Sequence, residues 1–278
     1  MARAEEPYYR MNKILAIAVL LLFMQSAIAQ KGIDDLIQAE KNFAAYSVAN
    51  NTKDAFLRFA DSAGIVFDKG KPVNAIEIWT TREKRPGKLN WWPVYAEIAS
   101  SGDFGYTTGP WDFSINDTVK ANGYYVTAWH INKNGEWKFL IDLGVGDTHC
   151  DVAALKTNAL KNDSQIKGTK VDLRQAEENM IAGYQQNGKI SYPNFLSDNS
   201  RLYRNGRCVA DQPEQRYLAL DSLPSKIQYT INGTGIASTG DMGYVYGTTV
   251  INGKTDNYLR IWQKEKSGWK ISVEVLRY

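Results

Sequence analysis

Histidine and cysteine are scarce in this sequence, whose 278 residues include only two of each. With His130 and His149 alone, a histidine-rich metal site is excluded. The sequence also lacks a Gly-x-Ser-x-Gly elbow, His-Glu-x-x-His, Cys-x-x-Cys and a glycine-rich phosphate loop before a lysine. Gly144 and Gly146 follow an expected strand, but no helix with a third glycine comes after them, so they form no dinucleotide fingerprint. We therefore expect no metal and no cofactor.

An excess of one charge and a long apolar run are missing as well. The formal net charge is +3 and no cluster of Lys and Arg stands out, which argues against a nucleic-acid partner. Ile14 to Phe23 is an unbroken apolar run of about ten residues, whereas a membrane-spanning helix needs roughly 20. The sequence therefore predicts no membrane-spanning helix at this position.

That apolar run has the pattern of a secretory signal peptide. Arg10 and Lys13 precede it, and Ala27-Ile28-Ala29 follows with the small-x-small pattern that signal peptidase needs. We expect residues 1–29 to be a signal peptide, with Met11 as the initiator and residues 1–10 as an upstream extension. The mature protein would then be secreted or periplasmic, without stable membrane insertion; an uncleaved N-terminal anchor is the alternative.

The two cysteines are Cys150 and Cys208. An exported chain allows them to pair, but one lies in an expected linker and the other in a later domain. Two free thiols or an incidental bridge is the simpler expectation. Cys150 also lies close to Asp147, His149 and Asp151, but their spacing matches no standard metal site.

What the sequence does contain is an internal repeat. The stretch SGDFGYTTG at 101–109 returns 138 positions later as TGDMGYVYG at 239–247. In each copy a Gly-Asp turn opens a strand that needs glycine where another surface comes close, and an aromatic residue where a core or pocket is filled. The repeat predicts two copies of one fold.

Both copies read as helices followed by strands. In the first copy, apolar spacing predicts helices over 33–48, 53–59 and 75–79 with a strand over 65–67, then strands over 89–98, 103–115, 123–131 and 137–143. In the second, it predicts a helix over 173–184, a helix and strand within 195–203, a capped helix over 213–220, and strands over 227–237, 242–251, 255–264 and 269–276. Residues 144–170 between them are polar, with a short helix over 152–160 as an option.

Helices followed by a long meander are typical of an α+β fold. We expect two tandem cone-shaped domains, residues 30–143 and 171–278, joined by a linker at 144–170. Each domain would be a strongly curved antiparallel sheet wrapped around N-terminal helices. A ligand would bind in the interior of such a cone.

The order of these motifs resembles a known family. The first copy contains Trp91-x-Pro93, then S-G-D-x-G-Y-x-x-G, then a hairpin that closes on Trp137 and Lys138. This succession is similar to that of the SnoaL-like branch of the nuclear transport factor 2-like superfamily. Ketosteroid isomerases and polyketide cyclases belong to that superfamily, so the resemblance implies an apolar cone that can support acid-base chemistry. The catalytic set of ketosteroid isomerase does not align with this chain residue by residue, and none of it is carried over.

The alternation of side chains along the strands predicts site residues in the first copy. Trp91, Tyr95 and Glu97 would share one face, and Tyr106 would share the interior from the next strand. Glu97 would be the one carboxylate there, and desolvation would raise its pKa, so Glu97 with Tyr106 as a donor is the candidate catalytic pair. A solvated position for Glu97 at the rim is the alternative. The ligand-pocket candidates of this copy are Trp91, Tyr95, Trp111 and Trp129.

The second copy offers an aromatic set with one cation. Arg260 could clamp an anionic ligand or pair with an acid at the rim. Asp142 and Glu274 occupy matching positions but alternate with Lys138 and Lys270, so we expect both acids on the outer face, at a dimer or interdomain contact. The pocket candidates of this copy are Tyr229, Tyr244, Tyr246, Arg260 and Trp262.

Three functions fit these features. The first is an exported tandem protein that binds a small apolar or aromatic ligand of unknown specificity. The alternative is a cofactor-independent isomerase, lyase or cyclase that uses Glu97 and Tyr106. The third is a protein-docking module that uses the outer sheet of the second copy. A homodimer is compatible with each of them.

Overall fold

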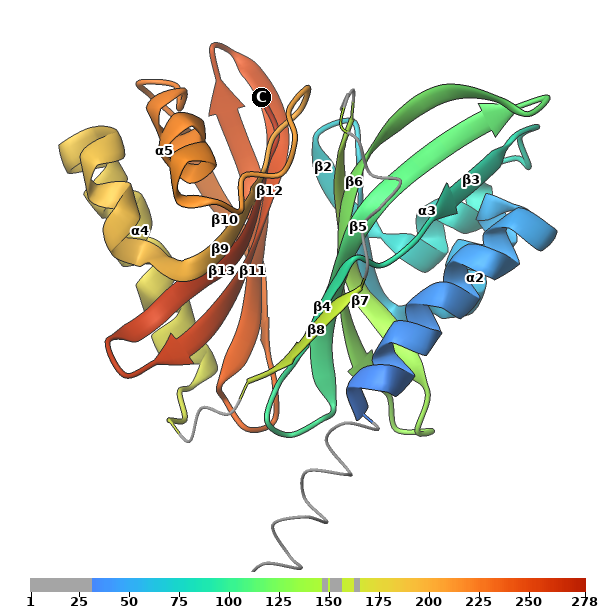
Figure 1. Ribbon diagram of the computed structural model, residues 1–278, viewed down its shortest axis with the longest axis horizontal. Coiled ribbons are helices and arrows are strands. Elements are labelled where there is room, and N and C mark those ends of the chain that lie inside the picture. Colours follow the sequence, from blue (N-terminus) through green and yellow to red (C-terminus); the bar gives the residue numbers. More distant parts are fainter. Residues whose placement is uncertain (1–31, 147–149, 151–156, 163–165) are drawn as a thin grey trace, which may run out of the picture.

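The computed structural model describes residues 32–146, 150, 157–162 and 166–278. Two β-sheets stand face to face, and helices cover the outer side of each sheet (Figure 1). We call residues 32–162, built on an eight-stranded sheet, the first unit, and residues 166–278, built on a five-stranded sheet, the second unit. The expected signal peptide and most of the optional helix at 152–160 lie outside the described residues.

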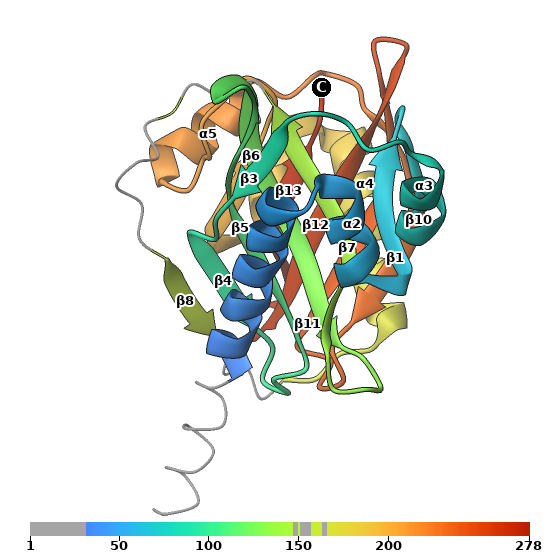
Figure 2. The same ribbon diagram turned by 90° about the vertical axis from the view of Figure 1, so that its right-hand side faces the viewer.

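In the first unit, a helix over residues 32–49 crosses the sheet, as the turned view shows (Figure 2). The sheet order is β2-β1-β7-β6-β5-β4-β8, and β3 pairs with β5 beside β4. The elements are α2 (Thr52–Phe59), β1 (Ala60–Asp68), β2 (Lys71–Asn74), α3 (Ala75–Thr81), β3 (Lys88–Trp91), β4 (Tyr95–Ile98), β5 (Phe104–Ile115), β6 (Thr118–Ile131), β7 (Trp137–Gly146) and β8 (Asn158–Lys161).

The second unit has the sheet order β10-β11-β12-β13-β9. Its elements are α4 (Lys170–Asn187), the 3₁₀ helix η1 (Gly188–Phe195), β9 (Leu196–Tyr203), α5 (Pro213–Asp221), β10 (Gln228–Ile236), β11 (Met242–Ile251), β12 (Lys254–Glu265) and β13 (Gly268–Leu276).

The α+β class is confirmed, but the sheets differ from the expected cones. They are mixed rather than antiparallel, because β1 pairs with β7 and β9 pairs with β13 in parallel. Neither sheet is strongly curled. The end of the expected linker also joins the first sheet, since β8 pairs in parallel with β4 and residues 158–160 are therefore strand rather than helix.

The repeated glycines sit where helices press on the sheets. A Cβ added to Gly105 would lie 2.6 Å from Leu36, and one added to Gly243 would lie 2.6 Å from Leu173. Both leucines belong to the long helix of their unit. The expectation that glycine marks a close approach is confirmed, because any larger side chain would force the helix away from the strand.

A continuous apolar core joins the two sheets. Phe104 and Tyr106 from the first sheet, and Tyr244 and Val275 from the second, belong to one buried cluster. The rings of Phe104 and Tyr244 are stacked with centroids 6.1 Å apart. Each sheet therefore buries both of its faces, one against its own helices and one against the other sheet.

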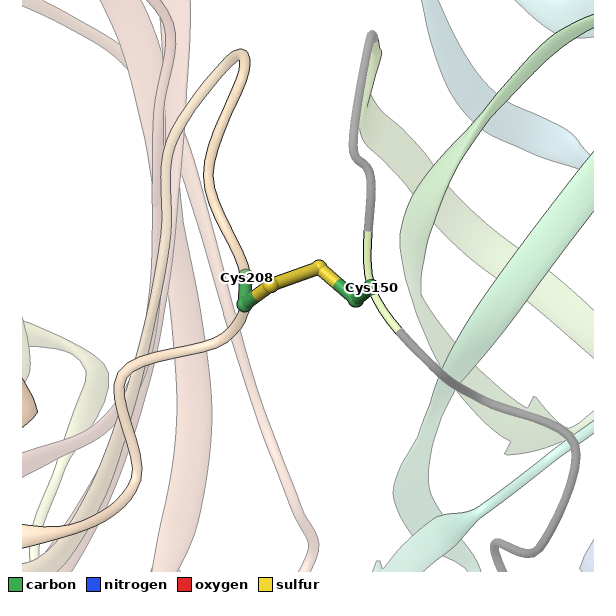
Figure 3. Close-up of a disulfide and its surroundings, with 2 residues drawn as sticks. All are labelled: Cys150 and Cys208. Carbon is green, nitrogen blue, oxygen red and sulfur yellow. A yellow bond between two sulfur atoms is a disulfide. The ribbon is translucent and has the colours of Figure 1, made fainter.

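A disulfide links the units at one end of this interface. Cys150 and Cys208 are bonded, with Cα atoms 5.7 Å apart (Figure 3). Beside the bond, Gly206 donates its backbone N–H to the carbonyl of Gly146 over 2.8 Å. The expectation of free thiols is wrong, because sheet packing brings the segment after β7 onto the loop after β9.

Candidate functional site

The first unit contains a cavity of about 580 Å³ between its helices and its sheet. The volume is within the usual range of small-molecule sites, roughly 300–1,000 Å³. Aromatic rings dominate its wall, and Asp142 contributes a carboxyl group. The lining residues from the helices and strands include Phe43, Phe56, Trp91, Trp111, Tyr125 and Asp142.

Asp142 projects into this cavity from β7. Thr127, its partner on β6, donates a hydrogen bond of 2.6 Å from Oγ1 to Asp142 Oδ2. Burial raises the pKa of Asp142 to about 6, and the Thr127 hydrogen bond offsets only part of that effect. The group can therefore gain or lose a proton near neutral pH.

The expected outer position of Asp142 is wrong because β7 contains a register shift. Trp129 pairs with Phe139 and Ala128 pairs with Ile141, which leaves Leu140 as an extra residue. A bulge of this kind exchanges the two faces of a strand. Phe139 therefore faces the helices while Ile141 faces the other sheet, and Asp142 returns to the helix side.

Glu40 lies deeper in the same interior, on the helix over residues 32–49, and is fully buried. Trp129 Nε1 donates to its Oε2 over 2.9 Å, and Trp91 Nε1 and Thr107 Oγ1 also donate to this carboxyl group. Burial raises the pKa of Glu40 to about 7, although the three donors oppose that shift. The first unit therefore holds two carboxyl groups that titrate near neutrality.

Tyr125 supplies an unused hydroxyl group. Its side chain lines the cavity and is 5% exposed. Within the part of the chain that the structure describes, its hydroxyl group has no hydrogen-bond partner. A buried hydroxyl without a partner is unfavourable, so this atom is suited to a polar group of a ligand.

Two arginines complete the cavity wall. Arg82 forms an ion pair of 2.7 Å with Asp68. Arg277 comes from the second unit and forms an ion pair of 3.3 Å with Asp256. The cavity is therefore bordered by both units, and each of its cations already has an acidic partner.

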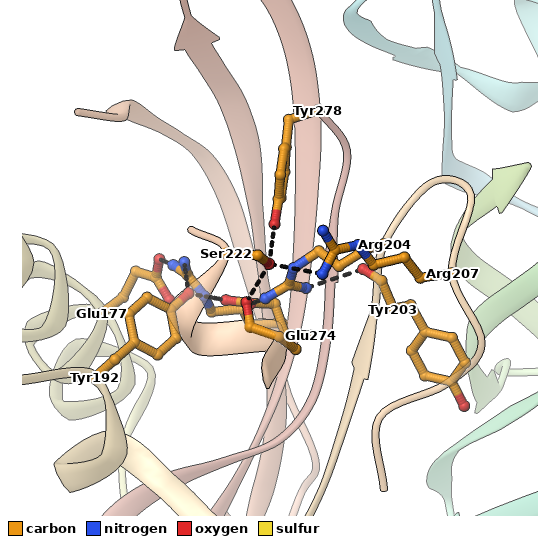
Figure 4. Close-up of polar contacts among 10 residues, drawn as sticks. Glu177, Tyr192, Tyr203, Arg204, Arg207, Ser222, Glu274 and Tyr278 are labelled. Atoms are coloured by element: carbon orange, nitrogen blue, oxygen red, sulfur yellow. Dashed lines mark hydrogen bonds and ion pairs between the residues drawn. The ribbon is translucent and has the colours of Figure 1, made fainter. Parts of the chain in front are cut away.

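The interior of the second unit is occupied by a network of charged side chains. Glu274 lies between Arg204 and Tyr192, both of which donate to it (Figure 4). Arg260 Nε lies 2.6 Å from Glu274 Oε2, and Arg260 also forms an ion pair with Glu177. Burial alone would raise the pKa of Glu274, but the two guanidinium groups outweigh it and lower that pKa to about 2.

Arg260 is also enclosed by aromatic rings. Its guanidinium carbon lies 4.8 Å from the ring centroid of Tyr229, 4.7 Å from that of Tyr258 and 5.9 Å from that of Tyr192. These distances are within the range of cation–π attraction. Arg260 was expected to bind an anionic ligand or to pair with an acid at the rim. Its partners are instead the two interior glutamates, Glu177 and Glu274.

The structure places Glu97, Tyr106 and Tyr95 between the two sheets, away from the cavity. Tyr106 donates its hydroxyl to Glu97 Oε2 over 2.8 Å, and Tyr95 does so over 3.3 Å. Burial raises the pKa of Glu97, as we expected, but the cause is the opposite sheet. The expectation that these groups face the interior is wrong.

Alternation failed here because the chain changes face between β3 and β4. Trp91 pairs with Trp111 while Tyr95 pairs with Thr108, so the path from 91 to 95 contains one residue more than its partner. Trp91 and Trp111 therefore line the cavity, as expected, and Tyr95 does not. Trp129 packs in the same interior with its indole N–H on Glu40.

The pocket candidates of the second unit are divided in the same way. Tyr229, Arg260 and Trp262 face the helices, where Trp262 Nε1 donates to Glu177 over 3.0 Å. Tyr244 and Tyr246 face the first sheet. Alternating strands that are buried on both faces give no signal that separates the two sides.

Sequence reasoning missed Glu40 and Glu177 as interior acids, although one signal was available. Gln38-Ala39-Glu40 recurs as Gln175-Ala176-Glu177, in the first described helix of each unit. Each glutamate accepts the indole N–H of the matching tryptophan. An acid repeated among apolar helix positions indicates a buried carboxyl group with fixed partners.

The described residues contain no group of three or more His, Cys, Asp or Glu side chains arranged to hold a metal ion. Their helices include none with the length and apolar character needed to cross a bilayer.

No family model matches the chain, and no curated protein matches its sequence. Among solved structures, it is similar to a ketosteroid isomerase-like protein from Erwinia carotovora atroseptica, with 14% identity and a TM-score of 0.33 over 39% of this chain and 94% of that one. It is also similar to an NTF2-like protein from Cytophaga hutchinsonii, with 19% identity and a TM-score of 0.32 over 39% of this chain and 96% of that one. A third similar structure is an NTF2-like protein of unknown function from Shewanella oneidensis, with 14% identity and a TM-score of 0.32 over 39% of this chain and 98% of that one.

Proposed function

We propose that the first unit binds a small molecule with an apolar or aromatic body in its cavity. The observation that carries this proposal is the buried Tyr125 hydroxyl, which has no partner among the described residues and borders a space of about 580 Å³. Aromatic walls provide affinity for an apolar body, and a few polar groups fix its orientation. The second unit would serve as support, because its charged network fills the equivalent interior.

The test compares Tyr125→Phe with Tyr258→Phe, its counterpart in the second unit. The protein is screened against aromatic fragments by ligand-induced change in Tm, and hits are measured by calorimetry. Tyr125→Phe should weaken a bound fragment that carries a polar group by about 3- to 10-fold, since one hydrogen bond is worth about 1 kcal/mol. Tyr258→Phe should leave that affinity unchanged. Equal effects of the two substitutions, or hits that bind outside the cavity, would contradict the proposal.

A second candidate is a cofactor-independent acid-base enzyme. One observation favours it, namely that Asp142 faces the cavity with a pKa of about 6. A carboxylate with that pKa is a usable general base near neutral pH. Turnover that is lost in Asp142→Asn, with ligand affinity retained, would favour this candidate over simple binding.

The wider proposal is that the chain is an exported tandem of two SnoaL-like units. Matching partners in the two interiors support the duplication, since Trp129 with Glu40 is repeated by Trp262 with Glu177. The Cys150–Cys208 bond supports export, because disulfides persist in oxidising compartments. Docking of a protein on the helix-free face of the second sheet is less favoured, because that face is buried against the first sheet. The absence of nucleic-acid and membrane partners, and a homodimer, stay predictions.

A further inference from the structure

The two interiors can be compared position by position through their strand registers. Thr127 pairs with Asp142 between β6 and β7, and Arg260 pairs with Glu274 between β12 and β13. Each pair lies just beyond a register shift at the same place in its sheet. Thr127 is therefore the counterpart of Arg260, and Asp142 is the counterpart of Glu274.

The rings around Arg260 have counterparts as well. Tyr258 and Tyr125 each precede these positions by two residues, and Tyr192 and Phe56 each precede the parallel strand of their sheet by four. Thr249 and Trp111 each lie two residues after the last glycine of the repeated motif. Tyr229 pairs with Thr249 and Trp91 pairs with Trp111, so Trp91 is the counterpart of Tyr229. Phe56, Trp91 and Tyr125 all line the cavity of the first unit.

The first unit thus has the same enclosure as the second, without its cation. Three aromatic rings and two carboxyl groups are present in both. In the second unit the guanidinium of Arg260 lies among them and bonds both acids. In the first unit the corresponding residue is Thr127, which reaches only Asp142, and a cavity remains.

We propose that the cavity of the first unit binds a small organic cation, with a guanidinium, amidinium or ammonium group between the aromatic rings and Asp142. This inference rests on the proposed function and names its ligand class. In the second unit the cation is Arg260 of the chain itself, whereas in the first unit a bound ligand supplies the cation. Aromatic rings and a carboxylate together are a favourable environment for such a cation.

The charges of the two interiors agree with this assignment. Two guanidinium groups overcome burial and hold the pKa of Glu274 at about 2, whereas burial raises the pKa of Asp142 to about 6. The cations at the border of the cavity, Arg82 and Arg277, are paired with Asp68 and Asp256. Those acids reduce the repulsion that a cationic ligand would meet at the border.

The first test uses benzamidine, a planar aromatic cation, with benzamide as its neutral isostere and benzoate as an anionic control. Binding is measured by calorimetry at pH 8, where Asp142 is ionised. Benzamidine should bind about 5- to 30-fold more tightly than benzamide, because a hydrogen bond between charged groups exceeds a neutral one by about 1–2 kcal/mol. Asp142→Asn should remove that preference, so that benzamidine and benzamide bind with similar affinity.

The second test places the cation in the chain. Thr127→Arg should occupy the cavity as Arg260 does, abolish benzamidine binding and raise Tm. Thr127→Val removes the same hydroxyl without adding a charge, and it should retain benzamidine binding. If Thr127→Arg does not fold, the comparison of benzamidine with benzamide on the native chain and on Asp142→Asn decides the matter.

The outcomes separate this inference from the proposed function. Benzamide or benzoate bound as tightly as benzamidine, with the Tyr125→Phe effect intact, would overturn the cation and leave small-molecule binding in place. Failure of benzamidine, benzamide and benzoate to bind would overturn the proposal of a cationic ligand. The fragment screen would then test the proposed function separately. Benzamidine bound equally by Thr127→Arg and Thr127→Val would place the cation outside this enclosure and overturn the inference.

Discussion

Thr127 and Arg260 occupy the same register position in their two sheets, one opposite Asp142 and the other opposite Glu274. Arg260 forms ion pairs with two buried carboxylates and Arg204 adds a second guanidinium beside Glu274, whereas Thr127 donates one hydrogen bond. The second interior therefore holds two cations for its two acids, and Thr127 brings no charge to the first. In the first unit the two interior carboxyl groups, Glu40 and Asp142, have no cationic partner among the described residues, and burial raises their pKa values.

Asp142→Asn should stabilise the protein at pH 8 and have little effect at pH 4. The folded pKa of Asp142, about 6, is above its ordinary value of 3.8, so ionisation opposes folding increasingly as pH rises from about 4 to 6. Removing the charge should recover about 2–3 kcal/mol above that range. Urea unfolding at both pH values measures the difference. Asp117→Asn, at a side chain 93% exposed, is the matched surface control.

Glu274→Gln should have the opposite effect and destabilise the protein at pH 7. It would leave the buried guanidinium groups of Arg204 and Arg260 without their shared carboxylate. Removal of one partner from a buried ion pair costs about 3–5 kcal/mol. The folded pKa of about 2 lies below the ordinary 4.5, so this stabilisation is complete above pH 4.5 and is lost as pH falls towards 2. An unfolding free energy equal to that of Asp142→Asn at pH 7 would show that the two interiors do not differ in charge balance.

Removal of the disulfide should lower stability without changing the fold. Cys150 and Cys208 are 58 residues apart, and a loop of that length predicts about 4 kcal/mol from chain entropy. The Cys150→Ala/Cys208→Ala double variant should therefore unfold at lower urea than the oxidised protein. The reduced wild-type protein is the matched control, and it should unfold close to the double variant. No difference between oxidised and reduced protein would make the bond incidental.

Tyr106→Phe should weaken the sheet interface and leave the cavity unaffected. The substitution removes the 2.8 Å hydrogen bond to Glu97, and loss of a bond to a buried acid costs about 1–3 kcal/mol. Affinity for benzamidine should stay within about 2-fold of wild type, because Tyr106 does not border the cavity. A large loss of affinity without a loss of stability would restore Glu97 and Tyr106 as site residues.

Much of the architecture was accessible from local patterns. The glycine motif of residues 101–109 and its return at 239–247 predicted that another surface comes close to each strand, and a helix residue lies against Gly105 and against Gly243. The helix cap at Asn74 is likewise local, since its side chain accepts a hydrogen bond of 3.0 Å from the backbone N–H of Glu77. These features depend on residues that are near neighbours in sequence.

The residues of the site were harder to predict, because strand register decides which side chains line the cavity. The extra residue at Leu140 turns Asp142 towards the helices, and the irregular path from Trp91 to Tyr95 turns Glu97 away from them. Side chains along a strand alternate between the two faces of the sheet. One unrecognised bulge therefore moves every later side chain to the face opposite the predicted one. The pattern of polar and apolar residues did not reveal these exchanges.

The sequence by itself determined the α+β class, most of the order of helices and strands, and the aromatic character of both interiors. Only the tertiary structure decided which face of each strand lies inside, which carboxyl groups obtained a cation, and that Cys150 meets Cys208. The physical reason is that both faces of each sheet are buried. One face packs on helices and the other on the opposite sheet, so hydrophobicity is similar on the two sides and only the packed register separates them.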